Sequence, residues 1–182
     1  MLQGLRIPGR TRPTARDVYR SEIGERVDWL LPQHKWEKGK DRPGILICPR
    51  CHAISMQKRW FLDEDRYQQL RMTPGVRVVI CTGCRRIEHQ VYEGVVQLRS
   101  PLLLANKSQA MALIHHEEAK ARQTNPFSRL ASVVDRGDTI DILTTTYWLA
   151  ERIGKAFHKS FKGSLDLQRL PNERFVRVRW ER

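Results

Sequence analysis

The chain of 182 residues has only four cysteines, and it lacks any apolar run of the roughly 20 residues that cross a membrane. Its 20 acidic residues are outnumbered by 33 lysines and arginines, which leaves a formal net charge of +13. It has no glycine-rich phosphate loop, no open metal site and no nucleophile paired with a base. The sequence therefore predicts neither an enzyme nor a membrane protein, and it predicts a monomer without a small-molecule substrate.

The four cysteines that are present form two C-x-x-C pairs, Cys48 with Cys51 and Cys81 with Cys84. Two such pairs supply the four thiolates of a tetrahedral structural Zn²⁺ site. An apolar run precedes each pair, so each pair is predicted to lie at a strand end as a knuckle. This pattern predicts a zinc ribbon. Four cysteine ligands leave no open coordination position, so the metal is expected to be structural.

Three alternatives to zinc can be weighed from the residues. Two disulfides would need an oxidising compartment, and no apolar signal-peptide region follows Met1. A thioredoxin-type redox pair would not require a second pair in a matching context. Iron stays an alternative because four thiolates suit both metals. Zinc is favoured, and cysteines kept for a metal are typical of a cytoplasmic protein.

The positive charge is spread along the whole chain. Each of the four segments 1–45, 46–98, 99–137 and 138–182 has an excess of three or four basic residues. An excess of positive charge in every segment indicates a protein that is surrounded by a polyanion on several sides, as RNA-bound proteins are. The candidate RNA-binding residues are Arg6, Arg10, Arg12, Arg16, Arg20, Arg50, His52, Lys58, Arg59, Arg85, Arg86, Lys155, Lys159, Arg177 and Arg179.

Two local patterns support this choice of residues. Basic residues flank the ligand cysteines, where a metal would fix their backbone, and Trp60 follows on a predicted hairpin, where it could stack on a base or pack. In the last strand, Val176 and Val178 alternate with Arg177 and Arg179, which gives one apolar and one basic face. The basic face suits RNA, whereas the alternative interpretation is an edge strand protected by charge.

The predicted fold class is α+β. Residues 1–44 form a basic arm that is disordered when free, because its arginines alternate with prolines and glycines and little apolar surface can be buried. Residues 45–99 form the zinc ribbon with a helical insertion that opens at Asp63. Residues 100–137 form a helix, ending near Arg122, and a linker. Residues 138–182 form a small α/β domain.

The pattern within that last domain is the most regular in the chain. Apolar residues of the segment from Tyr147 to Phe161 recur at helical spacing, and Leu149, Ile153 and Phe157 define its apolar face. A strand is predicted before this helix and two strands after it, which are residues 139–145, 164–170 and 174–180.

Two stretches of the chain resemble a known family. The first is Cys81-Thr82-Gly83-Cys84-Arg85-Arg86 followed by Tyr92-Glu93-Gly94-Val95-Val96-Gln97-Leu98-Arg99, and the second runs from Gly137 to Ile142. They resemble the large-ribosomal-subunit export-adaptor family, the archaeal and eukaryotic proteins named for nonsense-mediated decay. The resemblance covers roughly residues 45–170 and implies a zinc-ribbon module that docks on large-subunit ribosomal RNA.

This chain departs from that family in three ways. Gly94 stands where the family usually has alanine, and only one ribbon is present where the family usually has more C-x-x-C pairs. The family's later barrel domains and export tail have no counterpart, so nuclear export is not expected. The sequence thus favours an RNA-binding, ribosome-associated protein acting in assembly or in occupying an idle ribosome. The alternative is a DNA-binding or transcription-associated zinc ribbon.

Overall fold

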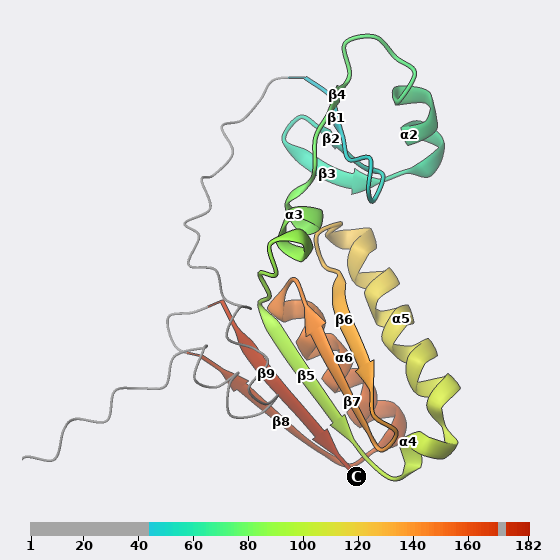
Figure 1. Ribbon diagram of the computed structural model, residues 1–182, viewed down its shortest axis with the longest axis vertical. Helices are drawn as coiled ribbons and strands as arrows, with labels where there is room; N and C mark the ends of the chain where they lie inside the picture. The colour runs from blue at the N-terminus through green and yellow to red at the C-terminus, as the bar shows by residue number, and fades with distance from the viewer. Residues whose placement is uncertain (1–43, 171–173) are drawn as a thin grey trace, which may run out of the picture.

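A computed structural model of the chain describes residues 44–170 and 174–182. These residues form a mixed α+β structure with two sheets and five helices (Figure 1). A small sheet lies at one end of the long axis and a larger sheet lies at the other. No helix in this described part is long and apolar enough to span a membrane. Residues 1–43 of the basic arm, with its five candidate RNA-binding arginines, lie outside the described residues.

The cysteine module, which we define as residues 44–92, contains the small sheet with strand order β3-β2-β1-β4. β1 is antiparallel to β2 and parallel to β4. Asp63 begins α2 by accepting a hydrogen bond from the backbone N–H of Arg66, which confirms the predicted helical insertion. The elements are β1 (Leu46–Ile47), β2 (Ala53–Met56), β3 (Arg59–Leu62), α2 (Glu64–Leu70), β4 (Arg77–Val78) and α3 (Thr82–Glu88).

The rest of the described chain, from residue 93 onward, forms the α/β body. Its sheet has the order β6-β7-β5-β9-β8, in which β5 is antiparallel to β7 and parallel to β9. The elements are β5 (Gly94–Arg99), α4 (Leu102–Ala105), α5 (Lys107–Thr124), β6 (Leu130–Asp135), β7 (Thr139–Thr144), α6 (Tyr147–Phe161), β8 (Ser164–Arg169) and β9 (Val176–Glu181).

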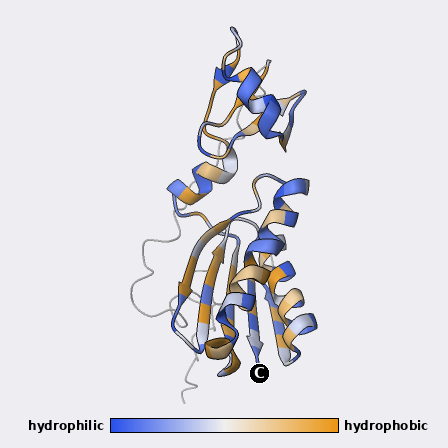
Figure 2. Cartoon of the chain, turned by 90° about the vertical axis from the view of Figure 1, so that its right-hand side faces the viewer, coloured by the Kyte–Doolittle hydropathy of each residue, from blue (hydrophilic) through white to orange (hydrophobic). Residues whose placement is uncertain are grey.

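The core of the body lies between its sheet and the two long helices. Alternate residues of each strand point to one face, so Val96, Ile142 and Val178 share a buried cluster with residues of α5 and α6. Trp180 is fully buried there, with its ring 5.4 Å from that of Phe157. Figure 2 shows the resulting alternation of hydrophobic and hydrophilic residues along the strands.

Two predicted boundaries differ from the structure. β5 pairs with β7 and β9 of the body, so the cysteine module ends before this strand and not at residue 99. The segment predicted as a linker before residue 137 contains β6, an edge strand that pairs with β7. An apolar strand can complete either sheet, and an edge strand has a weak pattern because it is only partly buried.

Gly94 lies where α6 crosses close to the sheet. A Cβ atom at this position would lie 2.6 Å from the Cβ of Ala150 and 2.6 Å from Oγ1 of Thr144. The alanine that is usual in the resembled family would therefore require a shift of α6 here. The glycine accounts for the close packing of α6 on β5.

Candidate metal centre

The four cysteines lie together in one buried cluster. Their Sγ atoms are all within 4.8 Å of one another, with 3.4 Å between Cys51 and Cys81 and 3.8 Å between Cys48 and Cys84. Four sulfurs at about 2.3 Å from a tetrahedral metal ion are separated by about 3.8 Å. A disulfide needs about 2.05 Å, so the cysteines are free thiols. The spacing is that of a site that could hold a metal ion.

The first pair lies in a tight turn between β1 and β2. The backbone N–H of His52 donates to the carbonyl of Cys48 at 2.9 Å, and the N–H of Cys48 donates to the carbonyl of Ala53. His52 has a φ of 61°, which closes the turn. This geometry agrees with the knuckle predicted for the first pair.

The second pair is not a knuckle at a strand end, which corrects the prediction. Cys81 is the N-cap of α3, and Cys84 lies in the first turn, where its N–H lies 3.4 Å from the Sγ of Cys81. Gly83 lets this turn approach the body, because a Cβ there would lie 2.9 Å from the Cα of Phe127. The four cysteines therefore connect the turn between β1 and β2 to the N-terminal end of α3. α3 in turn packs against the body.

Without a cation, the four sulfurs cannot all be ionised. Burial, followed by the charges of Cys51 and Cys48, raises the pKa of Cys84 to about 12. Hydrogen bonds from Cys51 and Cys81 lower the pKa of Cys48, and the shared bond with Cys48 raises the pKa of Cys81. The cluster thus favours fewer than four negative charges until a bound cation compensates them.

One residue at the centre was not identified from the sequence. Arg129 lies in the loop before β6, and its Nη1 donates to the Sγ of Cys84 at 3.0 Å. Its positive charge also acts to lower the pKa of the Cys84 thiol. The body therefore supplies a cation directly to a ligand sulfur. Nothing in the local sequence marks this arginine, because the contact spans 45 positions.

We expect Arg129→Met to weaken metal binding by about 10- to 100-fold, the usual effect of removing a group that holds a metal ligand in place. Without the positive charge of Arg129 the pKa of the Cys84 thiol rises further, so a proton competes more strongly with the metal for this sulfur. Competition with a zinc chelator measures the affinity, and Arg99→Met, an exposed arginine at the end of β5, is the matched control. Equal affinities of the two variants would mean that Arg129 has no role in the centre.

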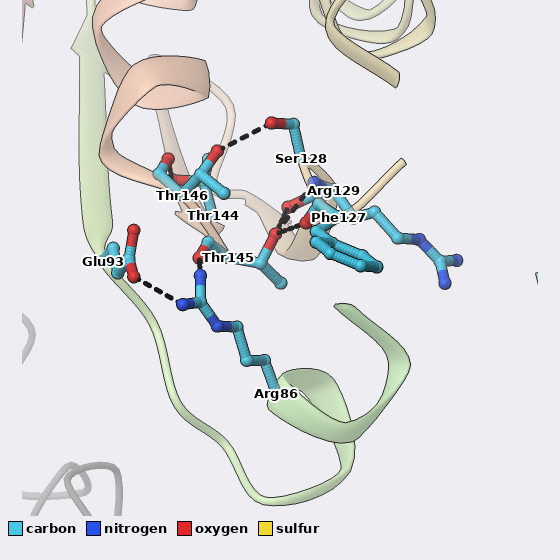
Figure 3. Close-up of polar contacts among 8 residues, drawn as sticks. All are labelled: Arg86, Glu93, Phe127, Ser128, Arg129, Thr144, Thr145 and Thr146. Atoms are coloured by element: carbon cyan, nitrogen blue, oxygen red, sulfur yellow. Dashed lines mark hydrogen bonds and ion pairs between the residues drawn. The ribbon is translucent and has the colours of Figure 1, made fainter. Parts of the chain in front are cut away.

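The side chain of Arg86, which the sequence suggested as an RNA contact, connects α3 to the body. Its guanidinium lies 2.7 Å from a carboxylate oxygen of Glu93 and donates to the carbonyl of Thr145 at 2.7 Å (Figure 3). The two side chains of this ion pair are 18% and 13% exposed. Burial raises the pKa of Glu93, and Arg86 opposes that shift. The pair therefore fixes the orientation of the metal centre on the body.

The other candidate RNA-binding residues differ in their surroundings. His52 stacks on Tyr67 at 4.1 Å and lies 2.8 Å from Glu64, whose pKa it lowers. Trp60 packs beside Phe127, with 5.7 Å between ring centroids, which favours the packing interpretation. The exposed candidates are Arg50, Lys58, Arg59, Arg85, Lys155 and Lys159.

Arg177 and Arg179 lie on the face of the larger sheet that is turned away from α5 and α6. They alternate with core residues along β9, as predicted, but both are only partly exposed. Arg177 donates to the side-chain oxygen of Gln168 at 3.1 Å, and burial lowers its pKa. β9 is also an interior strand between β5 and β8, which excludes the predicted alternative of an edge strand.

Comparisons with protein-family models, with curated proteins and with solved structures found no match to this chain. The resemblance to the export-adaptor family therefore rests only on the two stretches of sequence described for it. We infer function from the metal centre, the exposed cations and the net charge.

Proposed function

We propose that this chain is a zinc-stabilised RNA-binding protein that associates with the ribosome. It would act as an assembly or occupancy factor on the large subunit or on an idle ribosome. One observation carries the proposal: the turns that hold the four cysteines also present Arg50 and Arg85 to solvent. A closed metal centre with basic residues at its surface suits binding and not catalysis.

Zinc fits the donor set best. Four thiolates at tetrahedral spacing favour Zn²⁺, with iron as the other metal that uses the same ligands. The ligands would be Cys48, Cys51, Cys81 and Cys84. A reducing cytoplasm would keep these thiols available to the metal, and we place the protein there.

RNA is favoured as the partner by the distribution of charge. Exposed basic residues occur on the knuckle, on the β2–β3 hairpin and on α3, and the chain as a whole has a net charge of +13. Phosphate contacts of this kind set position without reading sequence. The ribosome offers RNA on several sides of a bound protein, and the residues shared with the export-adaptor family support that partner.

The experiment is binding to purified ribosomes over a range of salt concentrations, measured by sedimentation. We expect Arg50→Gln with Arg85→Gln to lower the slope of log affinity against log salt by about 1.4 to 1.8, since each lost phosphate contact removes about 0.7 to 0.9. Arg66→Gln with Arg71→Gln, two exposed arginines at α2, removes the same charge and is the control.

An unchanged slope in the Arg50 and Arg85 variant would remove these residues from the interface. Retention of the wild-type chain on duplex DNA, with no sedimentation with ribosomes, would replace the ribosome proposal with the DNA-binding alternative.

A further inference from the structure

The outward side of α6 carries one aromatic and four basic side chains in a single row. At 100° per residue, the four positions from residue 148 to residue 159 fall within about 60° of the helix circumference. With the residue that ends the helix, the row is about 20 Å long at 1.5 Å per residue. Its members are all exposed, and they are Trp148, Arg152, Lys155, Lys159 and Lys162.

The positive charge of this row is concentrated toward its C-terminal end. Arg152 lies 2.7 Å from Glu117 of α5, and Lys155 lies 3.4 Å from Glu151, so both cations are partly neutralised. Lys159 and Lys162 have no carboxylate partner within the described residues. The helix dipole accounts for lysines at a helix C-terminus. It does not account for the aromatic residue at the other end.

Trp148 is 56% exposed, which is unusual for a large aromatic side chain. Its ring lies 4.8 Å from that of Tyr147, at an interplanar angle of 32°. The core of the body does not include it, because the buried face of α6 is formed by other residues. An exposed ring that is braced by a second ring and continued by cations resembles the stacking platforms of single-strand-binding proteins.

We propose that the α6 row binds single-stranded RNA, with Trp148 stacking on a base and Lys159 and Lys162 contacting phosphates. This inference rests on the proposed RNA-binding function and adds a site on the α/β body, separate from the cysteine module. Duplex RNA fits less well, because its bases are stacked inside the helix and are not available to Trp148. An acidic protein would use the lysines but has no need of the exposed ring.

The test uses the full chain and a fluorescein-labelled oligouridylate of about 15 nucleotides, a length within the usual site sizes. Binding is measured by anisotropy at several salt concentrations. We expect Trp148→Ala to weaken binding about tenfold with an unchanged salt slope, and Trp148→Phe to restore most of the affinity. We expect Lys159→Gln with Lys162→Gln to lower the slope by about 1.4. Arg66→Gln with Arg71→Gln serves as the charge-matched control on α2.

The outcomes separate this site from the proposed function. If the wild-type chain binds the oligouridylate, and Trp148→Ala and the double lysine variant both bind it like the α2 control, the α6 site is wrong and RNA binding stands. If the wild-type chain binds ribosomes but not the oligouridylate, the α6 site is again wrong. If it binds neither, both proposals fail. Displacement of the labelled RNA by polyglutamate at a lower concentration than by unlabelled oligouridylate would indicate an acidic protein partner and would overturn the assignment.

Discussion

Replacement of Cys84 by serine is expected to unfold the cysteine module and to leave the α/β body folded. Metal binding at four cysteines contributes roughly 10–16 kcal/mol to the folding of small zinc domains. The cysteine module is expected to depend on this contribution from metal binding, because its β1 and β4 strands have two residues each and its apolar clusters are small. The body has its own sheet and one continuous core of buried residues.

Amide hydrogen exchange followed by mass spectrometry measures the two parts separately. Amides of β1, β2 and α3 should lose protection in Cys84→Ser, while those of β5, β7 and β9 keep it. Thr82→Ser changes an exposed residue of the same turn that is not a ligand, and it should behave as the wild type. A Cys84→Ser chain that stays fully protected without bound metal would show that the cysteine cluster is not a folding centre.

Replacement of Arg169 by methionine is expected to destabilise the body by about 3 kcal/mol. Its guanidinium makes two hydrogen bonds, of 2.7 and 2.9 Å, to the carboxylate of Glu151 on α6. The carboxylate is 2% exposed, whereas the arginine is 65% exposed. Loss of the arginine leaves the buried carboxylate of Glu151 with Lys155, at 3.4 Å, as its one cationic partner among the described residues. The uncompensated desolvation of this carboxylate is then the largest contribution to the loss of stability.

The asymmetry of this pair gives two controls in denaturant unfolding. Glu151→Leu with Arg169→Met removes both charges, and we expect a stability within about 1 kcal/mol of the wild type. Arg152→Met breaks the neighbouring pair with Glu117, whose partner carboxylate is more exposed, at 13%, and should cost about 1 kcal/mol or less. If Arg169→Met and Arg152→Met lower the free energy of unfolding equally, burial of Glu151 does not determine the cost of breaking its ion pair.

Features that depend on neighbouring residues in the sequence were predicted well. The predicted helix from Tyr147 to Phe161 has the bounds of α6, because its apolar spacing and the Lys162-Gly163 end are local signals. The cluster of four cysteines was predicted for the same reason: the C-x-x-C spacing determines which side chains could share one metal ion. Lys162 has a φ of 61° and ends the helix as expected.

Features that depend on tertiary contacts could not be predicted. The sequence of β5 does not say which sheet it joins, and it pairs with β9, more than 70 positions later in the chain. Arg129 and Glu151 are charged residues in ordinary local settings, and only the fold brings Arg129 to Cys84 and Arg169 to Glu151. Arg86 is a related case: it follows a cysteine of the second pair in the sequence, and only the fold shows that its guanidinium is mostly buried against Glu93 and Thr145.

Association with ribosomal RNA can be tested in growing cells by ultraviolet cross-linking of the protein to RNA, with sequencing of the attached fragments. Ribosomal RNA, mainly of the large subunit, is the predicted product, and cross-linked peptides should include the knuckle with Arg50, the α3 turn with Arg85 and the start of α6 with Trp148. Recovery of no RNA above the background of a non-irradiated sample, together with cross-links to DNA, would contradict the proposal that this protein binds ribosomal RNA.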